Sequence, residues 1–199
     1  MAYVEAAIRR TQFIAAARRA LARDGVANTS VRAVAAEADV PLGTMQYVFP
    51  SKELLLRAVI EDVVDEIAAV LRELGDADRG LEHAIRTALT GFWTQLVEGQ
   101  HWGDQVMQYE LTVYSLRAAG QGELARWQYQ RYTDVIAEWC QLAAANAHET
   151  SRVPFGKLSR IILAGMDGLI LQHVCDPDPA RSREDLDALI DGFVALACG

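Results

Sequence analysis

A short segment in the first quarter of the chain carries side chains that suit contact with DNA. Thr44 and Gln46 can hydrogen-bond the edges of bases, and Leu42 can touch a thymine methyl group. Gly43 lets a backbone approach DNA without a side chain between them. Tyr47 can reach a phosphate with its hydroxyl group. The segment therefore predicts a surface that faces nucleic acid.

Lys52 directly follows Ser51, a residue type that caps the N-termini of helices. A lysine there adds positive charge beside free backbone N–H groups, and both favour phosphate. Lys52 is therefore a predicted phosphate contact, although for Lys52 and Tyr47 a solvated surface position stays open as the alternative. Three residues at the start of an upstream helix complete the predicted DNA-binding set: Thr29, Ser30 and Arg32.

Helical patterns predict the elements that position these side chains. Apolar residues recur at helical spacing over 9–24, and Gly25 follows where a left-handed C-terminal cap belongs. Capping residue types precede a second, shorter pattern at 31–38. Pro41 suits the first turn of a third helix, which ends before Pro50 because proline disfavours helix at the preceding residue. Two short helices joined by a tight turn form a helix-turn-helix, whose second helix enters the major groove.

The whole chain predicts an all-α protein of nine helices without a strand. Residues 1–52 form an N-terminal three-helix head, the helix-turn-helix DNA-binding domain, and residues 53–199 form a larger helical ligand-binding and dimerisation domain. The six helices after the head are expected at about 52–74, 81–98, 103–118, 122–147, 157–174 and 183–198.

Charge is distributed unevenly between these two parts. The net charge of −8 argues by itself against a nucleic-acid partner. However, residues 1–52 contain seven Lys or Arg and four Asp or Glu, a balance of +3, which leaves −11 for the rest. A basic head on an acidic body is expected when only one end of a protein approaches phosphate.

The sequence TSVRAVAAEADVPLGTMQYVFPSKELLLRAV (29–59) resembles the tetracycline-repressor (TetR) type of bacterial transcription regulators. The resemblance implies an all-helical fold, a homodimer formed through the last two helices, and a small ligand in the larger domain that controls DNA binding. Regulators of this type often carry Ser, Thr or Lys before the glycine, where this chain has Pro41 and Leu42. Polar base contacts are therefore expected mainly from Thr44, Gln46 and Tyr47.

Aromatic residues concentrate in the predicted ligand-binding domain. Nine of the fifteen lie within 92–139, including all four tryptophans. Aromatic walls with a few polar groups are typical of ligand pockets, and a carboxylate beside such rings can receive an amine. Glu110, His101 and Asp104 are the candidates for this anchor, and a solvated surface charge is the open alternative for each. A plain hydrophobic core is the open alternative. The predicted pocket residues are Trp93, Trp102, Met107, Glu110, Tyr114 and Trp127.

The last two predicted helices are apolar over a wide arc. Ala164, Gly165 and Gly168 are small enough to let another helix approach closely. This composition predicts a homodimer through residues 157–198, in a four-helix arrangement. A monomer with a thicker core is the alternative.

Several classes of protein and site are not predicted. The N-terminus shows no signal or transit peptide. The apolar run 161–174 is interrupted by Asp167 and His173 and is shorter than the roughly 20 residues of a spanning helix. A soluble cytoplasmic protein without a membrane partner is therefore expected. Catalytic motifs, a metal site and a cofactor site are not recognised in the sequence, so an enzyme is not predicted.

Together these features predict a ligand-responsive transcriptional regulator, with repression expected from the resemblance. A dimer would present two third helices about 34 Å apart to double-stranded DNA, so its operator should be a pseudo-palindrome. A small apolar or aromatic ligand would release it by preferring the non-binding state. The alternative is a helical small-molecule-binding protein or enzyme with a vestigial helix-turn-helix. The sequence does not separate repression from activation.

Overall fold

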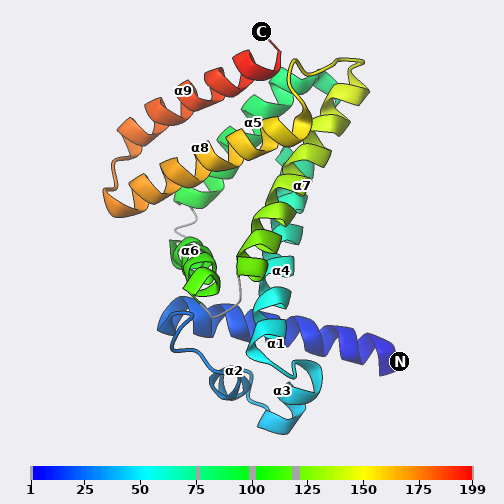
Figure 1. Ribbon diagram of the computed structural model, residues 1–199, viewed down its shortest axis with the longest axis vertical. Helices are drawn as coiled ribbons and strands as arrows, with labels where there is room; N and C mark the ends of the chain where they lie inside the picture. Colours follow the sequence, from blue (N-terminus) through cyan, green and yellow to red (C-terminus); the bar gives the residue numbers. More distant parts are fainter. Residues whose placement is uncertain (1, 75–76, 99–101, 118–121, 199) are drawn as a thin grey trace. The chain divides into compact units, whose positions relative to one another are not determined.

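The computed structural model describes residues 2–74, 77–98, 102–117 and 122–198 (Figure 1). Across these ranges the chain forms nine α-helices, one short 3-10 helix and no strand, which confirms the predicted fold class. The elements are α1 (Ala2–Asp24), α2 (Val31–Glu37), α3 (Leu42–Val48), α4 (Lys52–Leu74), the 3-10 helix η1 (Ala77–Arg79), α5 (Leu81–Glu98), α6 (Trp102–Arg117), α7 (Gly122–Asn146), α8 (Phe155–Cys175) and α9 (Pro179–Ala197).

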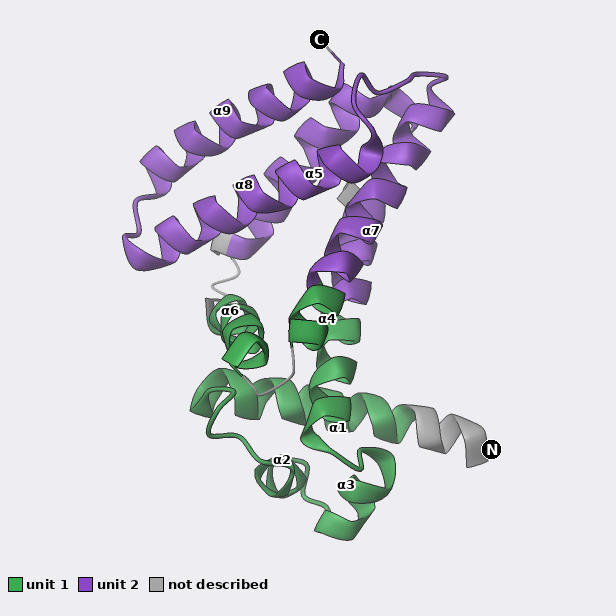
Figure 2. Cartoon of the chain, in the orientation of Figure 1, with its two compact units in different colours: residues 1–63, 101–128 green, residues 64–100, 129–199 purple. Residues whose placement is uncertain are grey.

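The chain divides into two compact units (Figure 2). Unit 1 contains residues 1–63 and 101–128, and unit 2 contains residues 64–100 and 129–199. The helices α4 and α7 each contribute residues to both units. The head predicted at residues 1–52 thus lies within a larger unit that also takes in α6.

In unit 1, α1 packs against α2 and α6, and α2 packs against α3. The apolar face of α1, including Phe13 and Leu21, is buried together with Met45 and Phe49 of the α3 region. The Oγ atom of Ser30 accepts a hydrogen bond from the Ala33 N–H at 3.1 Å and so caps α2. Pro41 is the residue just before α3 rather than part of its first turn. These contacts place α2 and α3 as the predicted helix-turn-helix.

In unit 2, α9 packs against α8 and α5. A side chain at Gly165 would begin 2.6 Å from the ring of Phe193, so a small residue is needed where α8 meets α9. Arg86 of α5 forms an ion pair with Asp191 of α9 at 2.7 Å. Asp178 caps α9 by accepting from the Arg181 N–H at 3.1 Å.

One helix of the described ranges, α8, is long and apolar enough to cross a membrane when only length and composition are considered. Its mean hydropathy over the tested window is 1.3. Core helices of soluble proteins pass the same test, and α8 buries Leu158, Ile162, Met166 and Leu169 within unit 2. The hydropathy of α8 is therefore weak evidence for a membrane.

Candidate nucleic-acid interface

The two sides of α3 differ in exposure. Met45 is completely buried and anchors the helix to unit 1. Gly43, Gln46 and Tyr47, which are three and four residues apart and so share one face of the helix, are exposed. Tyr47 is 88% exposed, which is far from the usual environment of a large aromatic side chain. This face presents a ring, an amide and a bare stretch of backbone to solvent.

The remaining predicted contacts on α2 and α3 divide by accessibility. Ser30 and Arg32 are exposed, and Leu42 and Thr44 are half-buried. Nothing lies within 4 Å of the position where a Cβ at Gly43 would stand. The backbone of α3 is therefore open to a close approach at its N-terminal turn, where a recognition helix meets base edges.

Thr29 requires a correction. The residue is only 3% exposed, and its hydroxyl donates to the Gly25 carbonyl at 2.8 Å and lies 3.3 Å from the Ala20 carbonyl. A side chain that is buried and engaged in this way does not reach a phosphate. Thr29 instead closes the turn between α1 and α2.

Lys52 also lies differently from the prediction. Its Nζ atom donates to the Val26 carbonyl at 2.6 Å and stands 4.6 Å from the centre of the Tyr114 ring. Burial lowers the pKa of Lys52. The ammonium group donates into unit 1, an internal hydrogen bond that the sequence analysis did not predict.

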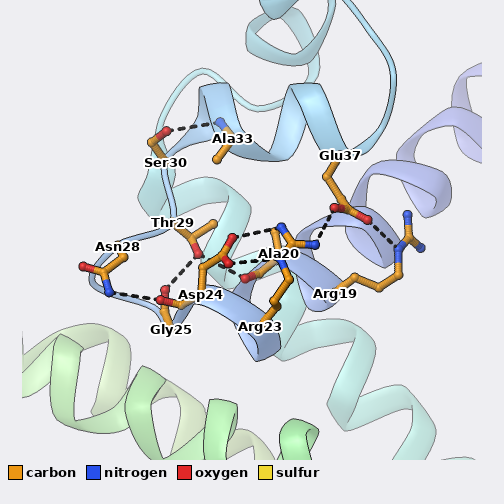
Figure 3. A network of polar contacts seen from close by, with 10 residues as sticks. All are labelled: Arg19, Ala20, Arg23, Asp24, Gly25, Asn28, Thr29, Ser30, Ala33 and Glu37. Carbon is orange, nitrogen blue, oxygen red and sulfur yellow. Dashed lines mark hydrogen bonds and ion pairs between the residues drawn. The ribbon is translucent and has the colours of Figure 1, made fainter.

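Most cations of the head are paired within unit 1. Arg19 and Arg23 both bind Glu37, at 2.9 and 2.8 Å, and Arg23 also binds Asp24 at 2.9 Å (Figure 3). The hydrogen bonds from Arg23 lower the pKa values of the Glu37 and Asp24 carboxyl groups. Both arginines are thus paired with carboxylates of the head itself, and Arg10 pairs with Glu61 of α4 at 3.4 Å.

Arg18 and Arg32, two cations of unit 1, differ in whether they form ion pairs. The guanidinium of Arg18 binds Asp62 of α4 at 2.9 Å and Asp104 of α6 at 3.2 Å. Arg32 is exposed and forms no ion pair among the described residues. Arg32 is therefore the predicted basic contact that stays accessible to phosphate.

Val26, in the turn between α1 and α2, is held by side chains from two other helices. Its N–H donates to Oε2 of Glu110 in α6 at 2.8 Å, and its carbonyl accepts from Lys52 at the start of α4. The preceding Gly25 has φ +79°, and a Cβ there would lie 3.1 Å from the same Glu110 oxygen. We call Val26, Glu110, Lys52 and Tyr114 the Val26 clamp.

The predicted pocket residues are divided between the two units. Glu110 and Tyr114 belong to the Val26 clamp, so the predicted ligand anchor at Glu110 is corrected to an internal acceptor. Met107 is buried in unit 1, and the guanidinium of Arg57 lies 4.6 Å from the Trp127 ring. Trp93 belongs to unit 2 and meets the His173 ring edge-on at 5.5 Å.

Two further predictions concern the start of α6. The side chain of Trp102 and the whole of His101 lie outside the described residues. Asp104 is described, and it pairs with Arg18. Its role in unit 1 is therefore an ion pair with α1, in place of the predicted pocket anchor.

Unit 2 contains polar groups that the sequence analysis did not select. The hydroxyl of Tyr129 donates to Oδ2 of Asp167 at 3.0 Å, and burial raises the pKa of Asp167. Trp139 Nε1 is a buried donor without a hydrogen-bond partner in the described structure. The interruption of an apolar run by Asp167 was a signal for this site, whereas the orphaned nitrogen of Trp139 has no sequence signal.

Comparison with known proteins decides the family. Residues 13–59 match the family model described as bacterial regulatory proteins, tetR family. Residues 82–196, more than half of the chain, match the model described as tetracyclin repressor-like, C-terminal domain. The chain belongs to the TetR family. As a TetR-family protein it is a ligand-responsive transcriptional repressor with a ligand-binding domain, and the family is regulatory rather than enzymatic.

Relatives of this TetR-family chain cover nearly its whole length. The HTH-type nicotine-responsive transcriptional repressor HdnoR of Paenarthrobacter nicotinovorans is 27% identical over 94% of each chain. The multidrug binding protein EbrR, solved with imidazole, is 27% identical with a TM-score of 0.66 and covers 92% of this chain and 93% of its own. A solved structure from Rhodococcus sp., at 19% identity, reaches a TM-score of 0.76 over 94% and 97% of the two chains, which supports the fold.

Proposed function

We propose that this repressor binds a pseudo-palindromic operator as a homodimer, and that a small apolar or aromatic molecule releases it. The exposed face of α3 carries the proposal, because Tyr47 is 88% exposed beside Gly43 and Gln46. The proposed DNA contacts are Ser30, Arg32, Leu42, Gly43, Thr44, Gln46 and Tyr47. Thr29 and Lys52 are left out because their polar atoms are engaged inside unit 1.

The homodimer is proposed to form through residues 157–198. Ile161 and Leu171 are exposed apolar residues of α8, and Ala164 between them is exposed and small. Such a face is stabilised when a second copy covers it. With α3 of each copy about 34 Å from its mate, one turn of DNA separates the two half-sites.

The effector is proposed to be a small aromatic molecule that carries nitrogen. The names of the relatives support this class, since HdnoR is nicotine-responsive and EbrR was solved with imidazole and with ethidium. In unit 2 of this chain, Trp93 supplies an aromatic ring. Asp167 replaces Glu110 as the proposed acidic partner, because its carboxyl lies beside Tyr129 in a desolvated position.

We further propose that the protein acts in the cytoplasm. Operator binding requires access to the chromosome, and the family matches support a soluble bacterial regulator.

Selection of bound fragments from the source genome, with the purified full chain at moderate salt, tests operator binding. Tyr47→Ala is the loss variant, and Tyr47→Phe separates the hydroxyl group from the ring. We expect enrichment of a palindrome with the wild type, its loss with Tyr47→Ala, and weakening with Tyr47→Phe. No enrichment with the wild type would contradict binding to a palindromic operator.

Light scattering coupled to size exclusion tests the dimer. We expect twice the mass of one chain for the wild type. Leu171→Glu places a charge on the exposed apolar face of α8 and should give the monomer mass. A monomer already in the wild type would refute the proposed interface.

A further inference from the structure

We propose that Glu110 and Lys52 are positioning residues for DNA binding, which hold the helix-turn-helix by gripping both main-chain polar groups of Val26. The inference rests on the proposed operator binding and assigns a function to residues outside the recognition helices. Neither residue touches DNA in this scheme.

Apart from Val26, the turn between α1 and α2 is held by local backbone hydrogen bonds. The Gly25 N–H donates to the Leu21 carbonyl at 2.9 Å, and the Thr29 N–H donates to the Gly25 carbonyl at 3.2 Å. Val26 has no partner of this local kind among the described residues, because its N–H and carbonyl bind Glu110 and Lys52. Val26 is 1% exposed, and buried main-chain groups without partners are costly. The two distant side chains therefore fix a turn that precedes Ser30, the cap of α2.

The position of Lys52 in the chain makes its hydrogen bond more than a local contact. Val26 lies before α2, and Lys52 is the first residue of α4, directly after α3 and its connection. The bond from Lys52 Nζ to the Val26 carbonyl thus closes a loop that contains all of α2 and α3. Entry to and exit from the helix-turn-helix are joined at one point.

The helix α6 supplies the support for this junction. Glu110 and Tyr114 are four residues apart and share one face of α6, so the Val26 N–H and the Lys52 ammonium group are held by the same helix. Gly103 on α6 approaches the Ala22 side chain of α1, and Asp104 pairs with Arg18. The helix α6 therefore contacts α1 itself and also holds, through the Val26 clamp, the turn that follows α1.

Charge removal separates positioning from simple electrostatics at Glu110. Loss of a negative charge from a DNA-binding unit should strengthen binding to a polyanion if charge alone matters. Glu110→Gln keeps the shape and an acceptor oxygen but weakens a charge-assisted hydrogen bond, so positioning predicts weaker binding. Glu123→Gln, an exposed carboxylate at the start of α7 in the same unit, is the matched control for charge.

Salt dependence separates the two roles of Lys52. A lysine that contacts phosphate contributes about 1 to the slope of log affinity against log salt concentration. A positioning lysine lowers the affinity when it is removed and leaves the slope unchanged. Lys52→Met keeps an apolar stem over the Tyr114 ring and removes only the ammonium group.

The test measures affinity of full-length variants for the operator fragment from the genomic selection, at several salt concentrations, with amide hydrogen exchange of Val26 in the free protein. We expect Glu110→Ala and Lys52→Met each to weaken operator binding about tenfold, the loss expected when a buried polar group loses its partner. Lys52→Met should keep the wild-type slope, and Glu110→Ala should speed exchange at Val26. Glu110→Gln should weaken binding less than Glu110→Ala, while Glu123→Gln should not weaken it.

Three results would overturn the proposal. A slope reduced by about 1 in Lys52→Met would assign that residue to phosphate. Glu110 variants that bind as tightly as wild type would remove Glu110 from positioning, and the isosteric Glu110→Gln decides this if Glu110→Ala does not fold. Failure of the wild type to enrich any fragment would refute operator binding itself, which is distinguishable from loss of positioning alone.

Discussion

Both units contain the same local device, a glycine followed by an N–H that binds a distant carboxylate, but the consequences differ. In unit 1, Gly25 at φ +79° precedes Val26, whose N–H donates to Glu110 at 2.8 Å. In unit 2, Gly80 at φ +93° precedes Leu81, whose N–H donates to Glu149, also at 2.8 Å. Each time a glycine in the left-handed region turns the next N–H towards a carboxylate more than sixty residues away.

The two devices differ in the segment that comes after the glycine. Leu81 is the first residue of α5, so Glu149 caps a long helix and stands at the positive end of its dipole. Val26 lies in a turn four residues before the cap of α2, and its carbonyl is gripped as well, by Lys52. The device in unit 2 therefore supports stability, whereas the device in unit 1 fixes the geometry of a functional surface.

Gly80→Ala should produce the largest effect. A Cβ at Gly80 would lie 2.6 Å from Glu149 Oε1, and a positive φ strains any residue with a side chain. We expect a loss of about 2 kcal/mol in the free energy of unfolding, or roughly 4–8 °C in Tm for a chain of this size. Thermal unfolding measures it, with Gly122→Ala as control because nothing lies within 4 Å of a Cβ there. An unchanged Tm for Gly80→Ala would contradict the strain.

Gly25→Ala should cost less stability and more function. The added Cβ would lie 3.1 Å from Glu110 Oε2, a looser contact than at Gly80. We expect about 1–2 kcal/mol of destabilisation, since a non-glycine residue is strained at this φ. Operator affinity should fall together with stability, whereas Gly80→Ala should keep the affinity of its folded fraction. Equal operator affinities of Gly25→Ala and Gly80→Ala, measured below their unfolding temperatures, would contradict the proposed difference between the two units.

Gly43→Ala should weaken operator binding without lowering stability. Gly43 has no positive φ and lies inside α3, so alanine should stabilise the helix by up to about 1 kcal/mol. The methyl group would stand on the exposed face beside Tyr47 and hinder close approach of DNA. We expect roughly tenfold or greater weakening of operator binding with an unchanged or raised Tm. Retained affinity would remove Gly43 from the interface.

The smallest effect is expected from the ion pairs between α1 and α2. Hydrogen bonds from Arg23 lower the pKa values of Glu37 and Asp24 below their ordinary values of 4.5 and 3.8. A carboxyl group with a depressed pKa stabilises the fold above its ordinary pKa, and this contribution is lost as the pH falls through the folded value. Arg23→Ala should flatten the decline in stability below about pH 4.5, as followed by chemical unfolding. Asp24 is exposed and Glu37 is half-buried, so the expected effect is small. An unchanged decline in Arg23→Ala would assign the acid sensitivity to other groups.

Helix positions were predictable because they depend on local sequence. The periodicity of α1, the cap at Ser30 and the glycine after α1 each act within a few residues, and the structure confirms them. The roles of Glu110 and Lys52 were not predictable, since their partner Val26 lies 84 and 26 residues away. A carboxylate near aromatic residues has the same sequence pattern whether it awaits a ligand or accepts a main-chain N–H. Only the packing of α6 against α1 decides between these roles.

The ion pairs of Arg18 determine which segments must be transferred together when the DNA-binding head is exchanged between relatives. A chimera cut after residue 52 would take Arg18 away from both Asp62 and Asp104, and Val26 away from Glu110. The recipient would then need its own acidic groups at both places to receive the transplanted arginine. A graft that carries residues 1–63 together with α6 keeps these partners, so the transferable module is discontinuous in the chain.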